Sequence, residues 1–223
     1  MWEKKIYINK IIDKKENGLI KVVTGIRRCG KSYLLDPLYK NYLLENGVKD
    51  DHIIKLDLDE RKNNKYLDPD ELDKYVRELI KDNEQYFLIL DERQKVDDFE
   101  SVLNGFLHIR NLDVYVTGSN SKFLSSDIIT EFRGRGDEIR IHPLSFTEFC
   151  SAFDGTEDEA WKQYIVYGGL PKILSFKNEI EKKWILKKLF DKTYLRDIVE
   201  RNNVQRVDVL DAVVNILTSS MVH

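Results

Sequence analysis

The sequence predicts an α/β fold with a mostly parallel sheet, followed by a region of helices alone. Three observations lead to this prediction. An apolar segment, 19–24, is followed by a glycine-containing loop, 25–32, and by helix-like spacing of apolar residues up to residue 44. A second apolar run, 86–90, ends in two acidic residues. After about residue 153 the strand-like runs stop and helical periodicity continues, so we expect an α/β core and then a helical segment.

Length and composition bound the architecture and the location. The 223 residues, 42% of them hydrophobic, suffice for one substantial core with a small appended domain. The net charge of −3 argues against a general polyanion binder. Cys29 and Cys150 form no spaced framework, and Cys29 lies in the glycine loop, so we expect a reducing, cytoplasmic location. No apolar run approaches the roughly 18 residues that cross a bilayer, and the four histidines are too far apart to form a metal pattern.

The glycine loop fits the phosphate-binding pattern G-x-x-x-x-G-K-[S/T] without a mismatch. Its glycines let backbone N–H groups surround phosphate oxygens, and the following helix presents the positive end of its dipole to the same anion. We expect Lys31 to reach the β- and γ-phosphates of ATP and Ser32 to ligate Mg²⁺. The residues expected to bind nucleotide here are Gly25, Ile26, Arg27, Arg28, Cys29, Gly30, Lys31, Ser32 and Tyr33.

The segments around this loop are predicted as an arm before it and an interrupted helix after it. Residues 1–18 predict a short helix or an extended arm; in many P-loop proteins such an arm lies near the nucleotide base, and plain edge packing is the other interpretation. The helix after the loop is expected to end at Asn46-Gly47. Pro37 removes a backbone hydrogen bond at a cost of about 3 kcal/mol, so it predicts a kink or a restart near residues 33–37.

The next strands deliver polar groups to one edge of the sheet. After a strand at 52–59 and a helix from Asp68 to about residue 83, the run 86–90 ends in Asp91 and Glu92, where ligands bind in doubly wound folds. We expect Asp91 to hold Mg²⁺ through water and Glu92 to polarise the attacking water. Arg93 is either solvated or paired with Glu92, and the sequence leaves both interpretations open.

Two further segments carry candidate catalytic residues. After a helix at 97–109, the strand 113–120 ends in small polar residues, of which Asn120 is the first choice and Ser119 the second for a contact with the γ-phosphate and water. A helix cap is the other interpretation. Arg133 and Arg135 lie among glycines, where they would supply an arginine finger to a neighbouring subunit or remain solvated in a turn.

The remaining chain predicts a last strand and then helices. A strand at 138–142 precedes a helix capped by Ser145 with Glu148 three residues on. Further helices are expected at 157–167, 179–201 and from 206 onward, with a glycine-proline break between the first two. The predicted boundaries are a core at 1–153, a helical lid at 154–205 and the start of a further domain at 206–223. The apolar end without a cap predicts a truncated chain.

The motifs occur in a characteristic order: Gly25–Ser32, Leu90-Asp91-Glu92, Thr117-Gly118-Ser119-Asn120-Ser121, Phe132-Arg133-Gly134-Arg135, Pro143-Leu144-Ser145-Phe146 and Tyr167-Gly168-Gly169-Leu170-Pro171. Together they resemble the prokaryotic AAA+-type ATPases whose core precedes a C-terminal domain of unknown function. The resemblance covers about residues 5–203. It implies a P-loop NTPase of three layers with a five-stranded AAA+-type sheet, a helical lid, and ATP and Mg²⁺ as ligands.

The resemblance also implies roles for single residues. Asn120 resembles the sensor of the fourth strand, and Arg133 and Arg135 resemble finger or sensor residues. Gly168, Gly169 and Pro171 would line the adenine side, and residues 206–223 would begin a winged-helix-like domain. Arg93, where family members usually carry an apolar residue, and Pro37 depart from the family pattern.

Two functions of different classes follow. The first is an Mg²⁺-dependent ATPase that couples hydrolysis to a conformational switch. The second is a nucleotide-gated module that recognises DNA or protein through its C-terminal region with little turnover. A small-molecule phosphotransferase is less favoured because paired acids suit activation of water. A homo-oligomer is compatible with each, and no membrane partner is expected.

Overall fold

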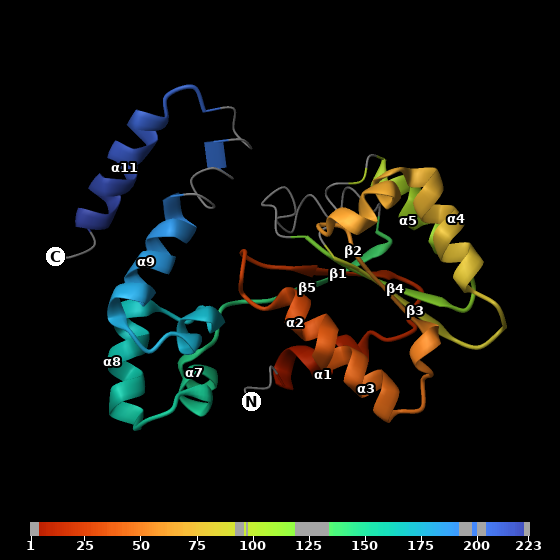
Figure 1. The fold of residues 1–223 in the computed structure, drawn as a ribbon, viewed down its shortest axis with the longest axis horizontal. Helices are drawn as coiled ribbons and strands as arrows, with labels where there is room; N and C mark the ends of the chain where they lie inside the picture. The colour runs from red at the N-terminus through yellow and green to blue at the C-terminus, as the bar shows by residue number, and fades with distance from the viewer. Residues whose placement is uncertain are drawn as a thin grey trace. The chain divides into compact units, whose positions relative to one another are not determined.

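A computed structural model describes residues 5–91, 96, 98–118, 134–191, 198–199 and 204–220. The chain divides into two compact units, Met1–Phe176 and Lys177–His223, each of which is described by itself. The boundary expected at residues 153 and 154 lies inside the first unit. Figure 1 shows the order of the elements along the chain.

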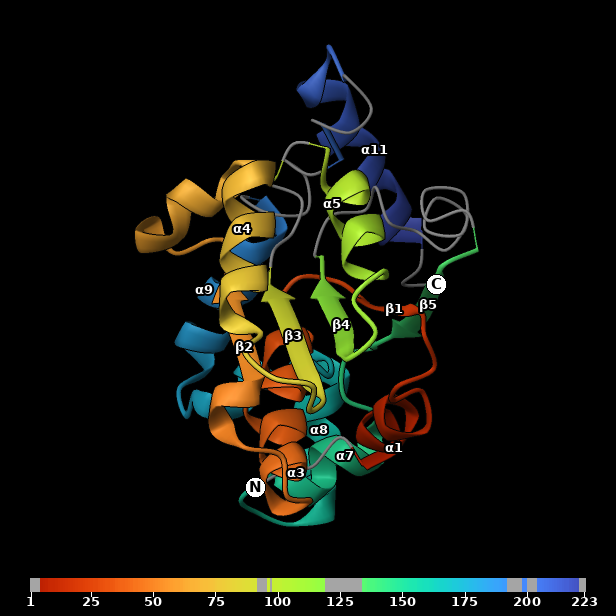
Figure 2. The ribbon, with the colours of Figure 1, turned by 90° about the vertical axis from the view of Figure 1, so that its right-hand side faces the viewer.

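Five strands form one parallel sheet, as expected, and their order is β2-β3-β4-β1-β5. Each strand is parallel to its neighbours, so all the carboxyl ends lie at one edge of the sheet and all the amino ends lie at the other (Figure 2). The last strand begins two residues earlier than predicted, because Gly136 already pairs with Ile20. The strands are β1 Ile20–Thr24, β2 Ile53–Asp57, β3 Tyr86–Asp91, β4 Leu112–Thr117 and β5 Gly136–Arg140.

Helices cover both faces of the sheet and give the three layers that the sequence predicts. On one face lie α4 (Pro69–Leu79) and α5 (Phe99–Phe106); on the other lie α1 (Lys5–Asp13), α2 (Lys31–Tyr33) and α3 (Lys40–Glu45), as Figures 1 and 2 show. Successive strand residues point to opposite faces. Two hydrophobic cores result, one on each face of the sheet. Strands covered on both sides are buried throughout, which explains the unbroken apolar run of β3.

The helix after the phosphate loop is interrupted where Pro37 predicts. A wider helical turn, η1 (Leu34–Tyr39), separates α2 from α3, and within it Asp36 has φ −142° and ψ 115°, far from helical values. The Asp36 carboxylate accepts a hydrogen bond from Lys55 of β2. The break therefore turns an acidic side chain toward the neighbouring strand.

Two short 3₁₀ segments flank β2 and approach the sheet from opposite ends. They are η2 (Asp50–His52) before the strand and η3 (Arg61–Leu67) after it. The first unit ends with α7 (Phe146–Ala152), α8 (Glu157–Tyr167) and η6 (Pro171–Ser175). Ser145 and Glu148 form the capping box that the sequence predicts.

The second unit contains α9 (Glu179–Leu189) and α11 (Val207–Ser220). The helix predicted over 179–201 is described as far as Leu189 in α9, and most of the rest lies outside the described residues. Within the part of the chain that the structure describes, no helix is both long enough and apolar enough to span a bilayer.

Candidate functional site: a phosphate loop at the carboxyl edge of the sheet

The loop between β1 and α2 adopts backbone conformations that require glycine. Gly25 has φ +143° and Gly30 has φ +100°, both in the region that side chains disfavour. A Cβ atom on Gly25 would also lie 2.3 Å from the carbonyl oxygen of Ile141, directly after β5. The loop is thus held against the end of a neighbouring strand, and any larger residue at position 25 would displace it.

Lys31 folds back over this loop. The residue is 5% exposed, and its Nζ donates hydrogen bonds to the carbonyl oxygens of Gly25 at 3.0 Å and Ile26 at 3.1 Å. Ser32, the next residue, is exposed, whereas Cys29 is fully buried in the core beneath the loop. The loop therefore holds a buried lysine ammonium on its own carbonyls, exposes Ser32 next to it, and is anchored in the core through Cys29.

Asp91 ends β3 at the same edge of the sheet. Its Oδ1 accepts a hydrogen bond from Thr117 Oγ1 at the end of β4, the strand between β3 and β1. Asp57 lies opposite Asp91 at the end of β2. The hydrogen bond with Asp36 is the main cause that raises the pKa of Lys55, and the charges of Asp57 and Asp91 add to it. Carboxylates and a cation thus gather at the edge where a ligand of a parallel sheet binds.

Several predicted site residues lie outside the described residues: Glu92, Arg93, Ser119, Asn120 and Arg133. Arg135 is described, and it lies at the amino end of β5, one residue before the pair Gly136–Ile20. Its Nη1 donates to Asn104 Oδ1 of α5 at 3.0 Å. The structure does not bring Arg135 to the phosphate loop of its own chain, so an action on that chain's nucleotide is not supported, and the finger toward a neighbouring subunit stays a prediction.

A hollow of about 470 Å³ opens beside the loop. Its walls are α1 with Tyr7, the segment 142–145 after β5, and Tyr164 of α8. The hydroxyl of Tyr7 accepts a hydrogen bond from the His142 backbone at 3.1 Å. The residue before His142, Ile141, lies against Gly25 of the phosphate loop, and the N-terminal helix lines the hollow.

Gly169 supports the wall of this hollow from behind. Its carbonyl accepts a hydrogen bond from the Leu144 backbone at 2.7 Å, and the Tyr164 hydroxyl donates to the Leu144 carbonyl at 3.0 Å. A Cβ on Gly169 would lie 2.1 Å from that same carbonyl. Gly169 thus contacts the wall residue Leu144, and Pro171 begins the next turn, η6. Leu144 and Thr117 belong to motifs that the sequence shows, but their contacts could not be predicted because their partners are distant in the chain.

Comparison with protein families identifies the domain. A family model described as "AAA domain" matches residues 17–150, more than half of the chain. The chain belongs to the AAA domain family. A second model, described as "Domain of unknown function (DUF8612)", matches residues 158–222, so the AAA domain is followed by the C-terminal domain that the sequence motifs indicated.

Two curated relatives of this AAA domain protein are uncharacterized. One, from Haemophilus influenzae, is 32% identical over 222 residues and aligns with 96% of this chain and 55% of its own length. The other, MJ1544 from Methanocaldococcus jannaschii, is 32% identical over 210 residues, with 89% and 46% coverage. The chain therefore spans about half the length of the curated relatives it matches.

Solved structures share the fold. The Walker-type ATPase PABY2304 of Pyrococcus abyssi aligns with a TM-score of 0.53 and 18% identity over 99% of this chain and 77% of its own. A closed state of Hsp104 with ATPγS and casein aligns with a TM-score of 0.54 and 13% identity over 92% of this chain and 42% of its own. At these identities the likeness establishes the fold alone.

Proposed function

We propose that the protein binds ATP with Mg²⁺ and hydrolyses it to drive or reset a conformational switch. The observation that carries the proposal is the common edge of the sheet, to which β1 brings the phosphate loop and Lys31 while β3 brings Asp91. A glycine loop with a helix behind it cradles phosphates, and a nearby carboxylate suits a magnesium ion held through water.

In the bound state the Lys31 ammonium would exchange the carbonyls of Gly25 and Ile26 for oxygens of the β- and γ-phosphates. The exchange is favourable because a hydrogen bond to an anion is about twice as strong as one to a neutral acceptor. The Ser32 hydroxyl and, through water, the Asp91 carboxylate would hold the magnesium ion. The chemistry the ion supplies is neutralisation of the charge that develops on the phosphates.

The hollow between α1 and residues 142–145 is the proposed base site. Its volume is within the range of ligand pockets, and two aromatic side chains, Tyr7 and Tyr164, line it together with apolar, polar and charged residues. The segment that forms one of its walls follows Ile141, whose carbonyl lies against Gly25 of the loop. Gly169 and Pro171 would act behind this wall, so the break after α8 can sense the occupied base site. Residues 154–205 as the lid and residues 206–223 as the start of a further domain stay proposals that rest on the sequence pattern.

Hydrolysis rests on Glu92 as the base that orients water, with Asn120 beside the γ-phosphate. The expected signature separates binding from turnover. Lys31→Ala should lower the affinity for ATP by at least about 100-fold, whereas Glu92→Gln should bind ATP normally and lose at least about 100-fold in turnover. Fluorescent-nucleotide binding and phosphate release measure the two effects. Lys40→Ala is the matched control, since Lys40 forms a partly exposed ion pair with Asp50 away from the loop.

If Glu92→Gln hydrolyses ATP at the parent rate, Glu92 is not the base. If Lys31→Ala binds ATP as the parent does, the loop is not the site. A native mass that rises with ATP would support a neighbouring subunit for Arg133 or Arg135.

The second candidate is a nucleotide-gated regulatory module with little turnover. It is favoured by one observation: α8 exposes Trp161, Ile165 and Val166, a surface suited to a protein partner. Phosphate release measured with and without DNA, and with and without the C-terminal half present in the relatives, distinguishes this module from a constitutive ATPase.

A further inference from the structure

His52 is a buried imidazole at the amino end of the sheet, outside the proposed nucleotide site. It ends η2, directly before β2, and is 4% exposed. Its ring stacks on Tyr86, the first residue of β3, with ring centroids 4.2 Å apart and an angle of 10° between the planes. The stacking fixes the plane of the imidazole and therefore the direction of both ring nitrogens.

Both nitrogens of His52 face carboxylates. Nε2 lies 3.4 Å from Asp82 Oδ2 and 3.8 Å from Asp51 Oδ1, and Nδ1 lies 3.8 Å from Glu84 Oε2. These separations exceed the usual hydrogen-bond range of about 2.7–3.2 Å. Within the described residues the ring nitrogens have no polar contact shorter than 3.4 Å. Buried polar groups normally have a hydrogen-bond partner.

The spacing suits ligands of one metal ion. Two ligand atoms that each lie about 2.0–2.1 Å from a tetrahedral zinc ion are about 3.3 Å apart. One ring nitrogen of His52 and one oxygen each from Asp82 and Glu84 lie within 4.8 Å of one another. The carboxylate side chains are 46% and 59% exposed, so they can rotate toward an ion, whereas the imidazole is already fixed.

We propose that His52, Asp82 and Glu84 bind a divalent transition-metal ion of the zinc class. His52 donates through Nε2, because Asp82 and Asp51 both face that nitrogen, and Asp51 adds negative charge beside it. Glu84 faces Nδ1 and must rotate to reach an ion on Nε2, which its exposed side chain allows. One imidazole and two carboxylates are a donor set that zinc accepts, with water completing the coordination. The ion joins the segment that leads into β2 to the turn that leads into β3.

The proposed centre is separate from the magnesium site of the nucleotide. His52 and Tyr86 lie at the amino ends of β2 and β3, and Asp57 and Asp91 lie at the carboxyl ends. Six residues of strand span about 20 Å. Zinc binding therefore does not depend on the proposed ATPase, and Lys31→Ala should leave it unchanged.

Lys49 provides a variant with the opposite effect. Its Nζ lies 2.9 Å from Glu84 Oε2, so the ammonium competes with a metal ion for that carboxylate. Removing the charge in Lys49→Gln frees Glu84. The variant should bind zinc more tightly, by up to about fivefold, which is the strength of one exposed ion pair. A loss of folding would not produce this gain.

The test is a zinc titration of the full chain without nucleotide, in competition with a chromophoric chelator. We expect one strongly bound Zn²⁺ per chain, and His52→Gln and Asp82→Asn should each weaken it by at least about tenfold. His108→Gln should bind as the parent does, since His108 is exposed at the end of α5. Zinc should also raise the thermal midpoint of the parent chain and not that of Asp82→Asn.

Asp82 is an exposed surface residue, so Asp82→Asn keeps the test valid if His52→Gln does not fold. The proposal is overturned if the parent chain does not bind zinc, or if Asp82→Asn binds it as tightly as the parent. It is equally overturned if Cys150→Ser, rather than the His52 or Asp82 variant, abolishes binding.

Discussion

The two ends of the parallel sheet hold their lysines in opposite ways. At the carboxyl end, Lys31 donates to backbone carbonyls of a loop whose neighbouring Ser32 is exposed. At the amino end, Lys21 is 0% exposed and forms an ion pair with Asp113, which is 4% exposed. In the proposed function the first lysine exchanges its carbonyl partners for phosphate oxygens, whereas the second stays paired with Asp113.

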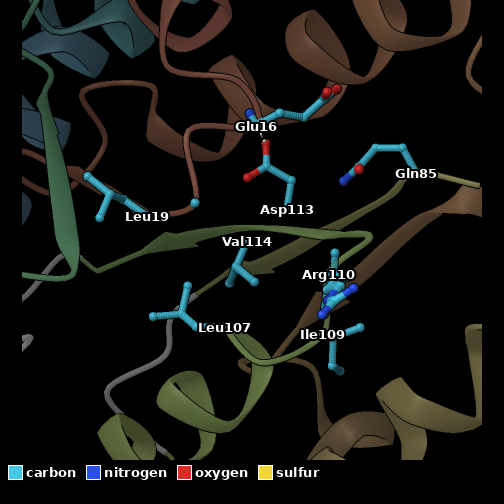
Figure 3. Close-up of a pocket in the computed structure, with 10 residues that line it drawn as sticks. Glu16, Leu19, Gln85, Leu107, Ile109, Arg110, Asp113 and Val114 are labelled. Atoms are coloured by element: carbon cyan, nitrogen blue, oxygen red, sulfur yellow. Dashed lines mark hydrogen bonds between the residues drawn. The ribbon is translucent and has the colours of Figure 1, made fainter.

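Asp113 is the centre of the network at the amino end. One carboxylate oxygen pairs with Lys21, and the other accepts hydrogen bonds from the Tyr115 hydroxyl at 2.7 Å and the Glu16 backbone at 2.9 Å. Figure 3 shows Asp113 directed toward Glu16 at the edge of a small hollow of about 100 Å³. Tyr39 extends the network, with its hydroxyl 2.6 Å from that of Tyr115.

This difference predicts that the amino end of the sheet serves stability and that the carboxyl end serves ligand binding. Desolvating two charges is expensive, and the cost is recovered only when every polar atom has a partner, as it has around Asp113. A ligand site needs the reverse, because a charge that is already fully paired gains nothing from a ligand. We therefore expect variants at the amino end to change folding and variants at the carboxyl end to change nucleotide affinity.

The largest expected effect on folding is that of Asp113→Ala. The change leaves the Lys21 ammonium buried without its counter-charge, so the free energy of unfolding should fall by about 3–5 kcal/mol. Urea denaturation monitored by far-ultraviolet circular dichroism measures the loss. The fraction that stays folded should bind ATP with the parent affinity, because Asp113 lies at the far end of the strands from the loop.

Asp137→Ala is the matched control. Asp137 lies in β5 and pairs with Lys14, but both side chains are partly exposed, so the loss should be no more than about 1 kcal/mol. Equal losses in the two variants would mean that burial does not set the strength of the Asp113 pair. A loss of ATP affinity in Asp113→Ala would break the separation of the two ends.

Features carried by neighbouring residues were predictable from the sequence. The strand before the glycine loop, the break at Pro37 and the Ser145–Glu148 capping box each depend on residues a few positions apart. Asp91 was predictable as the end of a buried strand, because strands covered on both faces are apolar until they reach the sheet edge. Glu92, Asn120 and Arg133 stay predictions, since they lie outside the described residues.

Features that depend on distant contacts were not predictable. Lys21 and Asp113 are 92 residues apart, and nothing near either one marks the pairing. The position of Arg135 follows from the register of β5 against β1, which is set by tertiary packing. His52 meets Asp82 and Glu84 only because β2 and β3 are neighbours, so the spacing of histidines along the chain gave no metal pattern.

Gly169→Ala should have a smaller effect, and it should lower both the free energy of unfolding and the affinity for ATP. The added Cβ would lie 2.1 Å from the Leu144 carbonyl, so the hydrogen bond between the two backbones must lengthen or break. We expect a loss of about 1–3 kcal/mol in the free energy of unfolding. Because Leu144 lines the proposed base site, ATP affinity should fall as well, while affinity for inorganic triphosphate, which lacks a base, should not.

Gly47→Ala controls for the cost of a side chain at positive φ. Gly47 has φ +88° and open space around the position of a Cβ, so the change should cost about 1 kcal/mol and leave ATP affinity intact. If Gly169→Ala lowers the affinities for ATP and triphosphate by the same factor, the hollow beside the loop is not the base site.

The smallest expected effect is on the unfolding free energy at alkaline pH, and it comes from two buried tyrosines near the amino end of the sheet. Burial raises the pKa of Tyr39 and of Tyr115 above the ordinary value of 10.0, so both stay protonated in the fold where the unfolded chain ionises. Stability is unaffected by them below pH 10 and falls as pH rises beyond it, by up to about 1.4 kcal/mol per pH unit for each tyrosine. Burial lowers the pKa of Lys21, which makes stability rise with pH up to its unfolded value of 10.5.

Tyr39→Phe isolates this contribution. Above pH 10, Tyr39 and Tyr115 both make the unfolding free energy fall with pH, and the variant should lose about half of that combined slope. Near neutral pH its unfolding free energy should fall by only about 1 kcal/mol, the value of one hydrogen bond. Urea denaturation at several pH values between about 8 and 11 measures the slope of the unfolding free energy. An unchanged slope in Tyr39→Phe would mean that this hydroxyl ionises as readily in the fold as in the unfolded chain, and that water reaches the amino end of the sheet as it does the carboxyl end.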